Sequence, residues 1–317
     1  MNHYMRSPSS HPGLREAPVA GIERRIAAPS ETEGGPGDRW DDLTAHDLDR
    51  CASFKCRSCI ESRIASVRLG DVDLARIGLG TNRLTNTPHN AAFIKEAIAA
   101  GVQMIDTAHS YTGGQSEETI GEALSATTGS FMVATKGGIG GPGQGKPEVL
   151  RAQIEQSFGS LRTDRIELYY LHRVDPVTPI EESLAAIKEY QDSGKITHIG
   201  VSEVTIEQIE RARRVVPIAA VQNEYSIVQR KYDAVVDYCS REGIVFVPFF
   251  PLRGETPGRA AEIAKQHQAT PQQIKLAWLL RRSPAMLPIP GTLSLDHMKE
   301  NLAATEIQLS DAEFNSL

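Results

Sequence analysis

The sequence predicts a closed barrel of eight parallel strands, each followed by a helix, and two observations support this α/β fold class. From residue 66 onward, strand-like and helix-like segments alternate over about 250 residues, the usual length of such a (β/α)8 TIM barrel. Most strand segments are apolar throughout, as expected when both faces of a parallel sheet are covered. An open, doubly wound sheet is the alternative. Its Gly-x-Gly-x-x-Gly turn is absent, because Gly78-Leu79-Gly80 is followed by Thr81-Asn82-Arg83.

Residues 1–65 differ in character from the rest of the chain. Prolines break any periodicity there, and Gly34-Gly35-Pro36-Gly37 is typical of a linker. We expect residues 1–65 to form a mostly disordered N-terminal extension, with at most one short helix at Asp41–Asp49. The barrel domain is expected to span residues 66–317.

A β-hairpin is predicted to open the domain. Val67-Arg68-Leu69 and Val72-Asp73-Leu74 both alternate apolar and polar residues, and Gly70-Asp71 between them is a two-residue turn sequence.

Eight strands and eight helices are expected to follow the hairpin. The strands are predicted at Arg76–Leu79, Gln103–Ile105, Phe131–Thr135, Ile166–Leu171, Thr197–Val201, Ala219–Gln222, Val245–Phe249 and Met286–Ile289. The helices are predicted at Asn90–Ala100, Ser116–Leu124, Pro147–Ser160, Ile180–Ser193, Ile206–Val215, Tyr232–Arg241, Pro271–Arg282 and Asp296–Ala303. The third helix begins with a proline, which suits a first helical turn, and places Leu150, Ile154 and Phe158 on one face.

Composition excludes several classes of function. A formal net charge of −6 argues against nucleic acid as the main partner. The longest apolar runs, such as Ile244–Leu252, fall well short of the roughly 20 residues that span a bilayer. The N-terminus lacks the apolar core of a signal peptide, and four cysteines do not suggest a disulfide framework. We therefore expect a cytoplasmic protein without membrane contact, and a monomer because no heptad repeat is visible.

Chemically reactive side chains cluster at the ends of three consecutive predicted strands. Asp106 ends the second strand, Lys136 the third and His172 the fourth, and Tyr111 lies in the loop after Asp106. In a barrel the carboxyl ends of the strands meet on one rim, where the chemistry of this fold takes place. Each residue alone has a plainer explanation, such as a helix cap for Asp106 or a core position for His172. Their joint occurrence favours a catalytic site.

The four residue types suit reduction of a carbonyl. Hydride addition builds negative charge on the oxygen, which needs a proton and hydrogen-bond donors. A phenol is a weak acid at neutral pH, and a neighbouring ammonium makes it a better one. We therefore expect Tyr111 to be the general acid, Lys136 to activate it, Asp106 to keep Lys136 charged, and His172 to orient the substrate oxygen.

From Val67 to Leu317 the chain resembles the aldo-keto reductase family, in particular its bacterial, pyridoxal-reductase-like members. Asp106-Thr-Ala-His-Ser-Tyr111 with Ser116-Glu117 resembles one family signature, and Gly194-Lys195-Ile196 leading to Gly200-Val201-Ser202 resembles another. Segments 221–225 and 287–292 resemble its cofactor segments. The resemblance implies a (β/α)8 barrel, NADPH as hydride donor, and Asp106, Tyr111, Lys136 and His172 as the catalytic tetrad.

The resemblance also implies a set of cofactor-binding residues. Ser202 and Gln222 would bind the carboxamide, and Phe249 would stack on the nicotinamide. The full set is Gly80, Thr81, Asn82, Ser202, Gln222, Phe249, Leu252, Gly291, Thr292, His297, Glu300 and Asn301. Gly291 and His297 replace two cations that hold the 2′-phosphate in many members, so NADH remains an alternative donor. Glu203 stands where many members have asparagine.

Three cysteines precede the barrel at Cys51, Cys56 and Cys59, with His46 upstream. Their spacing echoes part of an iron–sulfur or zinc site, but no fourth cysteine lies nearby. We predict no metal site and leave redox-sensitive thiols as an alternative.

The sequence thus predicts an NADPH-dependent reductase of a small-molecule aldehyde or ketone, with a tyrosine general acid. Small polar or aromatic aldehydes, including pyridoxal, fit the polar mouth that His109, Arg173, Asn82 and Arg83 would form. The same tetrad is compatible with oxidation of an alcohol. The N-terminal extension leaves a second hypothesis open, in which the chain is a non-catalytic, NADPH-binding, redox-sensing regulatory module.

Overall fold

The computed structural model describes residues 66–125, 131–255 and 258–317. The expected disordered extension, the short helix at 41–49 and the cysteine cluster all lie outside these residues. Within the described ranges, no helix is both long and apolar enough to cross a membrane.

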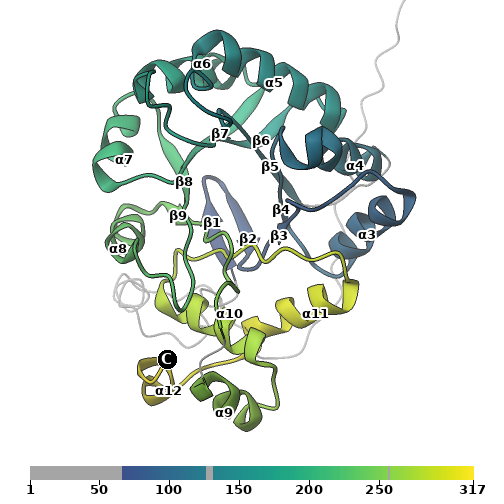
Figure 1. The fold of residues 1–317 in the computed structure, drawn as a ribbon, viewed down its shortest axis with the longest axis vertical. Coiled ribbons are helices and arrows are strands. Elements are labelled where there is room, and N and C mark those ends of the chain that lie inside the picture. The colour runs from purple at the N-terminus through teal and green to yellow at the C-terminus, as the bar shows by residue number, and fades with distance from the viewer. Residues whose placement is uncertain (1–65, 126–130, 256–257) are drawn as a thin grey trace, which may run out of the picture. The chain divides into compact units, whose positions relative to one another are not determined.

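The described chain folds as the predicted barrel of parallel strands with an outer layer of helices (Figure 1). Seven strands pair in the order in which they occur in the sequence, and every neighbouring pair is parallel. They are β3 (Leu79–Gly80), β4 (Met104–Asp106), β5 (Met132–Gly137), β6 (Ile166–Leu171), β7 (Ile196–Ser202), β8 (Ile218–Gln222) and β9 (Val245–Phe246). The carboxyl ends of all seven therefore share one rim.

An extended segment closes the barrel where the eighth strand was predicted at Met286–Ile289. It bridges β9 through Phe246 and Met286 on one side and β3 through Gly80 and Gly291 on the other. The amides of Gly78 and Gly80 donate to the carbonyls of Pro288 and Pro290 at 3.0 and 3.2 Å. Pro288 and Pro290 have no N–H to donate to β3 in return. The hydrogen bonds between the two segments therefore run in one direction only, and no regular strand forms.

The helices match the predicted positions closely, because their first turns carry strong capping signals. Thr205 and Thr270 form capping boxes with Gln208 and Gln273, and Pro88, Pro147 and Pro271 each occupy a first turn. These helices are α3 (Pro88–Ala99), α4 (Gln115–Leu124), α5 (Pro147–Leu161), α6 (Ile180–Asp192), α7 (Ile206–Arg213), α8 (Asp233–Glu242), α10 (Pro271–Arg282) and α11 (Leu295–Ala303).

Two helices were missed by the sequence analysis. Helix α9 (Gly258–Gln266) packs against α10, and it buries Ala260, Ile263 and Ala264 at helical spacing. Helix α12 (Asp311–Asn315) is a single short turn that begins with a capping box between Ser310 and Glu313. Short segments of this kind give a weak periodic signal, so their neighbours decide whether they become helical.

The core consists of two apolar clusters that follow the alternation of side chains along each strand. Met104, Met132, Ala134, Leu168 and Ala220 belong to the cluster inside the barrel. Their sequence neighbours, such as Ile105, Val133 and Val221, belong to the cluster between the strands and the helices. Alternate residues of every strand therefore point into the barrel.

The predicted hairpin is present and closes the amino-terminal end of the barrel. Strands β1 (Ser66–Leu69) and β2 (Val72–Ala75) pair in antiparallel register, with Leu69 opposite Val72 across the Gly70-Asp71 turn. Val67, Leu69 and Leu74 join the interior cluster. The Asp71 carboxylate lies 3.0 Å from Nε2 of His198 at the start of β7, so the turn is fixed to the barrel.

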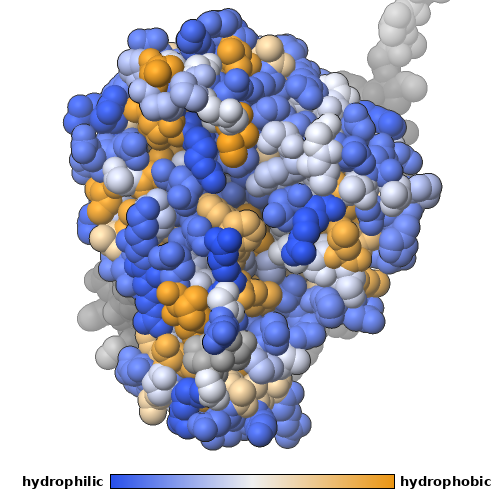
Figure 2. Space-filling model, in the orientation of Figure 1, coloured by the Kyte–Doolittle hydropathy of each residue, from blue (hydrophilic) through white to orange (hydrophobic). Residues whose placement is uncertain are grey.

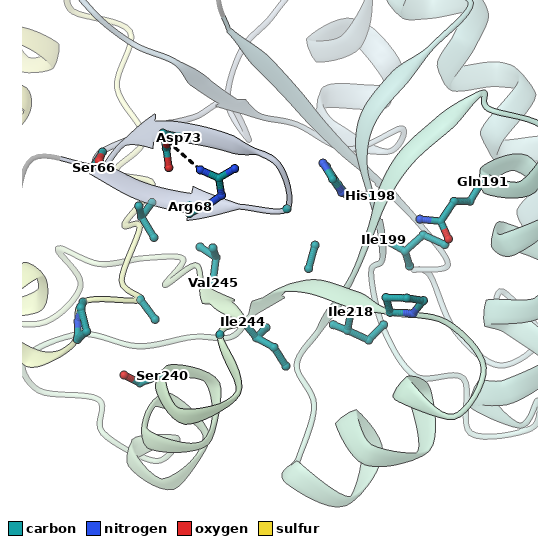
Figure 3. A pocket seen from close by; sticks show the side chains of 17 residues that line it. Ser66, Arg68, Asp73, Gln191, His198, Ile199, Ile218, Ser240, Ile244 and Val245 are labelled. Carbon is teal, nitrogen blue, oxygen red and sulfur yellow. Dashed lines mark hydrogen bonds and ion pairs between the residues drawn. The ribbon is translucent and has the colours of Figure 1, made fainter. Parts of the chain in front are cut away.

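A hollow of about 800 Å3 lies beside the hairpin, at the end of the barrel away from the predicted catalytic rim. Figure 3 shows Arg68 and Asp73 of the hairpin on one side of it and Ile218, Ile244 and Val245 on the other. Arg68 and Asp73 form an ion pair at 3.2 Å across the hairpin.

The hairpin turn should tolerate no side chain at Gly70. Its φ is +60°, and an added Cβ would lie 2.1 Å from Cε1 of His198. We expect Gly70→Ala to lower the free energy of unfolding by about 1–3 kcal/mol, through backbone strain and displacement of the imidazole. Urea denaturation would measure this. Gly159→Ala is the matched control, since nothing lies within 4 Å of that position, and an equal loss in both variants would contradict the explanation.

Candidate active site

The alternation of side chains places four polar residues in one layer at the carboxyl ends of β4, β5, β6 and β8. Asp106 follows Met104 by two residues, Lys136 follows Ala134, His172 follows Tyr170 and Gln222 follows Ala220, and each of these preceding residues lies inside the barrel. The polar layer therefore lies directly above the apolar interior. All four side chains are buried, with at most 4% of any residue exposed.

Lys136 is the hub of this layer. Its ammonium donates to Asp106 Oδ1 at 2.6 Å, to the carbonyl of Thr107 at 2.6 Å and to the hydroxyl of Tyr111 at 3.3 Å. These three contacts use all three N–H bonds of the ammonium. The second oxygen of Asp106 accepts a hydrogen bond of 2.7 Å from Gln222 Nε2.

Lys136 stays charged despite complete burial. Burial by itself disfavours the ammonium, but the adjacent Asp106 carboxylate and the Tyr111 hydroxyl outweigh it and raise the pKa of Lys136. Burial also pushes the pKa of Asp106 upward, and the hydrogen bonds from Lys136 and Gln222 oppose this rise. The geometry is that of an ion pair in which the ammonium uses all three N–H bonds and each carboxylate oxygen accepts a hydrogen bond.

Tyr111 lies beside the Lys136–Asp106 pair and is the first residue of a 3₁₀ turn, Tyr111–Gly114. The next residue, Thr112, adopts a left-handed φ of 51°, and its hydroxyl donates to the carbonyl of Leu84 at 2.6 Å. The Tyr111 ring contacts the His172 ring edge-to-face with centroids 5.9 Å apart, and Lys136 Nζ lies 4.8 Å from its centroid. The phenol thus lies between an ammonium and an imidazole.

His172 is a neutral imidazole in this setting. Burial, reinforced by the charges of Lys136 and Arg173, lowers its pKa to about 2. Its Nδ1 is buried and has no hydrogen-bond partner among the described residues. A neutral imidazole can donate a hydrogen bond to an oxygen without taking the proton away from Tyr111.

A cavity of about 220 Å3 opens over these residues. Tyr111 and His172 contribute its polar base, Ile139 and Ile289 apolar walls, and Phe249 and Phe250 an aromatic side. Figure 2 shows apolar and strongly hydrophilic side chains next to each other near the middle of the ring of helices. The cavity is large enough for a small carbonyl compound.

Arg173 contacts two of the three predicted nicotinamide residues. Its NH1 donates to Ser202 Oγ at 3.1 Å, and its guanidinium carbon lies 5.8 Å from the centroid of the Phe249 ring. The third, Gln222, donates to Asp106 as described above. Ser202 and Gln222 end β7 and β8, so they lie on the same rim as the four predicted catalytic residues.

A second hollow of about 280 Å3 adjoins the cavity and shares residues 80–83 and Gly291 with it. Thr292 and His297 line its outer part, and His297 lies in the first turn of α11. An added Cβ on Gly80 would lie 2.8 Å from the carbonyl of Ile289, so this wall depends on a glycine. Eight of the predicted cofactor residues line the two adjoining hollows: Gly80, Thr81, Asn82, Gln222, Phe249, Gly291, Thr292 and His297.

Four predicted cofactor residues line neither hollow, and Ser202, described above, is one of them. Leu252 lies in the loop after β9, where its carbonyl accepts a hydrogen bond from Lys275. Glu300 is hydrogen-bonded to Thr270, and Asn301 is buried on α11.

Comparison with known proteins shows which family this chain is similar to. A sequence model described as "Aldo/keto reductase family" matches residues 76–317. The chain belongs to the aldo/keto reductase family. It is thus an oxidoreductase, as the sequence analysis predicted.

Individual relatives agree with this assignment. An uncharacterized oxidoreductase of Schizosaccharomyces pombe is 37% identical over 275 residues, covering 81% of this chain and 90% of the relative. Pyridoxine 4-dehydrogenase of Escherichia coli is 35% identical over 273 residues, covering 78% and 96%. An aldo/keto reductase from Klebsiella pneumoniae, solved with NADP and acetate, superposes with a TM-score of 0.72 at 27% identity and covers 80% of this chain and 93% of that one.

Asp175 is a structural residue of this reductase that the sequence analysis missed. Its carboxylate accepts hydrogen bonds from the amides of Gly143 and Gly145, each at 3.0 Å, and from the hydroxyl of Thr178 at 2.8 Å. It thereby fixes the glycine-rich loop after β5, which carries Ile139 to the cavity wall. The available signal was an aspartate four residues past the end of β6, in a chain whose preceding strand is followed by a glycine-rich loop.

The stability of the reductase should depend on pH through His172. The native imidazole stays neutral down to about pH 2, whereas the unfolded one gains a proton below about pH 6.5. The unfolded state therefore gains relative stability as the pH falls. Between pH 7.5 and 5.5 the wild type should lose about 1.4 kcal/mol more unfolding free energy than His172→Gln. Urea titrations of both proteins at both pH values would show this, and parallel pH dependences would contradict it.

The buried ion pair should be strongly coupled. Asp106→Leu or Lys136→Met alone leaves a buried charge without its partner, and we expect each to lower the free energy of unfolding by about 3–5 kcal/mol. The double variant should lose clearly less than the sum of the two. Denaturant titrations of the four proteins measure this coupling, and additive losses would show that the pair does not interact as the geometry indicates.

Proposed function

We propose that this reductase catalyses NADPH-dependent conversion of an aldehyde or ketone to the alcohol, with Tyr111 as the proton donor. The observation that carries the proposal is the set of contacts of Lys136. A buried ammonium, held charged by Asp106, contacts the hydroxyl of Tyr111, and a neutral His172 lies on the other side of that phenol. This arrangement suits protonation of an oxygen that becomes negatively charged.

The roles of the residues follow from their charges. The carbonyl oxygen lies between the Tyr111 hydroxyl and the His172 imidazole, and both donate hydrogen bonds to it. Tyr111 gives its proton to this oxygen, and the Lys136 ammonium stabilises the phenolate that remains. The alcohol leaves, and Tyr111 regains a proton from solvent. In the reverse direction the phenolate would act as the base.

The two hollows fit a reduced nicotinamide dinucleotide, which when bound supplies the hydride for the carbonyl carbon. Phe249 offers an aromatic face for the nicotinamide, and Ser202 a buried hydroxyl for its carboxamide. The second hollow is lined by polar residues such as Thr81 and Asn82 and reaches His297 in the first turn of α11. Arg83 on its wall has no hydrogen-bond or ion-pair partner among the described residues. A helix start and an unpaired guanidinium suit phosphate groups. The NADP complex of the Klebsiella pneumoniae structure supports the same cofactor.

Pyridoxal and 4-nitrobenzaldehyde are suitable first substrates. The similarity to pyridoxine 4-dehydrogenase supports a small aromatic aldehyde as substrate. The polar base and aromatic side of the cavity also suit such a compound.

Tyr111→Phe tests the role of the phenol. It removes the proton donor but keeps the ring, so we expect turnover to fall at least about a hundredfold while the dissociation constant for NADPH stays within twofold. NADPH oxidation, followed by its absorbance, measures turnover, and fluorescence titration measures binding, with NADH in parallel. Tyr190→Phe, on the outer helix α6, is the control and should keep wild-type turnover. NADPH binding by the wild type without turnover of any carbonyl would contradict the proposal and support a redox-sensing role.

A further inference from the structure

We propose that Arg173 selects carbonyl substrates that carry a carboxylate group. This inference rests on the proposed reductase function and adds the chemical class of its substrate. Arg173 follows His172 directly beyond the end of β6, and its half-buried side chain lines the same cavity as Tyr111 and His172.

The guanidinium of Arg173 has hydrogen bonds but no counter-charge. NH1 donates to the carbonyl of His172 at 2.6 Å and to Ser202 Oγ at 3.1 Å, and both acceptors are neutral. No carboxylate of the described residues forms an ion pair with it. An arginine that is partly removed from water gains most from a bidentate contact with an anion, and its planar donors match a carboxylate.

The cavity around Arg173 is positively charged. Among the described residues that line it, the one acid is Asp106, and its charge is balanced by Lys136. Arg83 adds a second guanidinium at the rim, and His172 is neutral. The chain as a whole has a net charge of −6, so this cationic cavity is a local site that attracts anions. Apart from Asp106, no side chain that lines it among the described residues is negatively charged.

Cofactor binding would free the Arg173 guanidinium from two of its present contacts, so that it could bind the substrate. The guanidinium contacts Ser202 and Phe249, the two groups proposed above to hold the nicotinamide. A ring stacked on Phe249 would compete for both, and the guanidinium would have to turn toward the space in front of Tyr111 and His172. A carboxylate on the substrate then replaces the lost contacts. The arrangement therefore implies tighter carboxylate binding to the cofactor complex than to the free protein.

Other arginines of the rim are less suited to this role. Arg83 is exposed and also lines the second hollow, so it faces the proposed phosphate groups. Arg253 already forms an ion pair of 2.6 Å with Glu224, and it lines neither hollow. Arg253 therefore provides a matched control.

The test compares 4-carboxybenzaldehyde with its methyl ester, which differ in charge but share the ring and the reacting carbonyl. We expect wild-type protein to have a higher kcat/KM for the acid than for the ester. Arg173→Leu should lower the acid-to-ester ratio of kcat/KM about ten- to a hundredfold, the scale of a lost charge-assisted contact. Arg173→Lys should recover part of the ratio, and Arg253→Leu should leave it unchanged.

A binding measurement separates this inference from the proposed function. Calorimetric titration with benzoate, in the presence and absence of NADPH, needs no turnover. We expect the wild type to bind benzoate more tightly with NADPH and Arg173→Leu to lose at least tenfold in that affinity. A wild type that prefers the ester, or a ratio and a benzoate affinity that are both unchanged in Arg173→Leu, would overturn the role of Arg173. A wild type that reduces neither aldehyde would instead contradict the reductase function, and the benzoate titration alone would then decide on Arg173.

Discussion

The ion pair between Lys136 and Asp106 is the interaction on which the candidate site depends. It lies in the last layer inside the barrel, directly above apolar side chains such as Ala134 and Met104. A charge at that depth is costly unless every donor and acceptor is used, and here the ammonium makes three contacts and the carboxylate accepts two. The pair fixes the Tyr111 loop to β4 and β5, so stability and site geometry arise from the same contacts.

The different charge states of Lys136 and His172 follow from one cause, which is burial at or beside the Lys136–Asp106 pair. Lys136 keeps its charge because Asp106 touches it, whereas His172 loses its charge because it is buried beside cations and has no carboxylate partner. Two basic groups a few ångströms from the same phenol therefore differ in charge at neutral pH. This difference gives the phenol one neighbour that stabilises its anion and another that only donates a hydrogen bond.

Sequence reasoning predicted the barrel, the hairpin and the meeting of Asp106, Tyr111, Lys136 and His172, because each depends on local periodicity and on the shared rim of parallel strands. It was wrong about a regular strand at Met286–Ile289, where prolines remove the donors of one edge, and it missed α9 and α12. It also did not foresee that Gln222 donates to Asp106 or that Arg173 contacts Ser202. Such contacts between distant strands depend on the directions of long side chains, which no spacing in the sequence encodes.

The irregular closure of the barrel has a consequence for binding. Between β9 and β3 the chain runs as an extended segment whose prolines leave the pairing with β3 incomplete, and Gly80 and Gly291 bring the two backbones close together. The cavity and the second hollow meet at this seam, since both are lined by residues 80–83 and Gly291. A regular eighth strand with side chains at these glycines would fill the passage between them. The segment around residues 286–291 therefore has two effects. Its prolines prevent a regular eighth strand, and its glycine leaves open the continuous surface that a long, phosphate-bearing ligand requires.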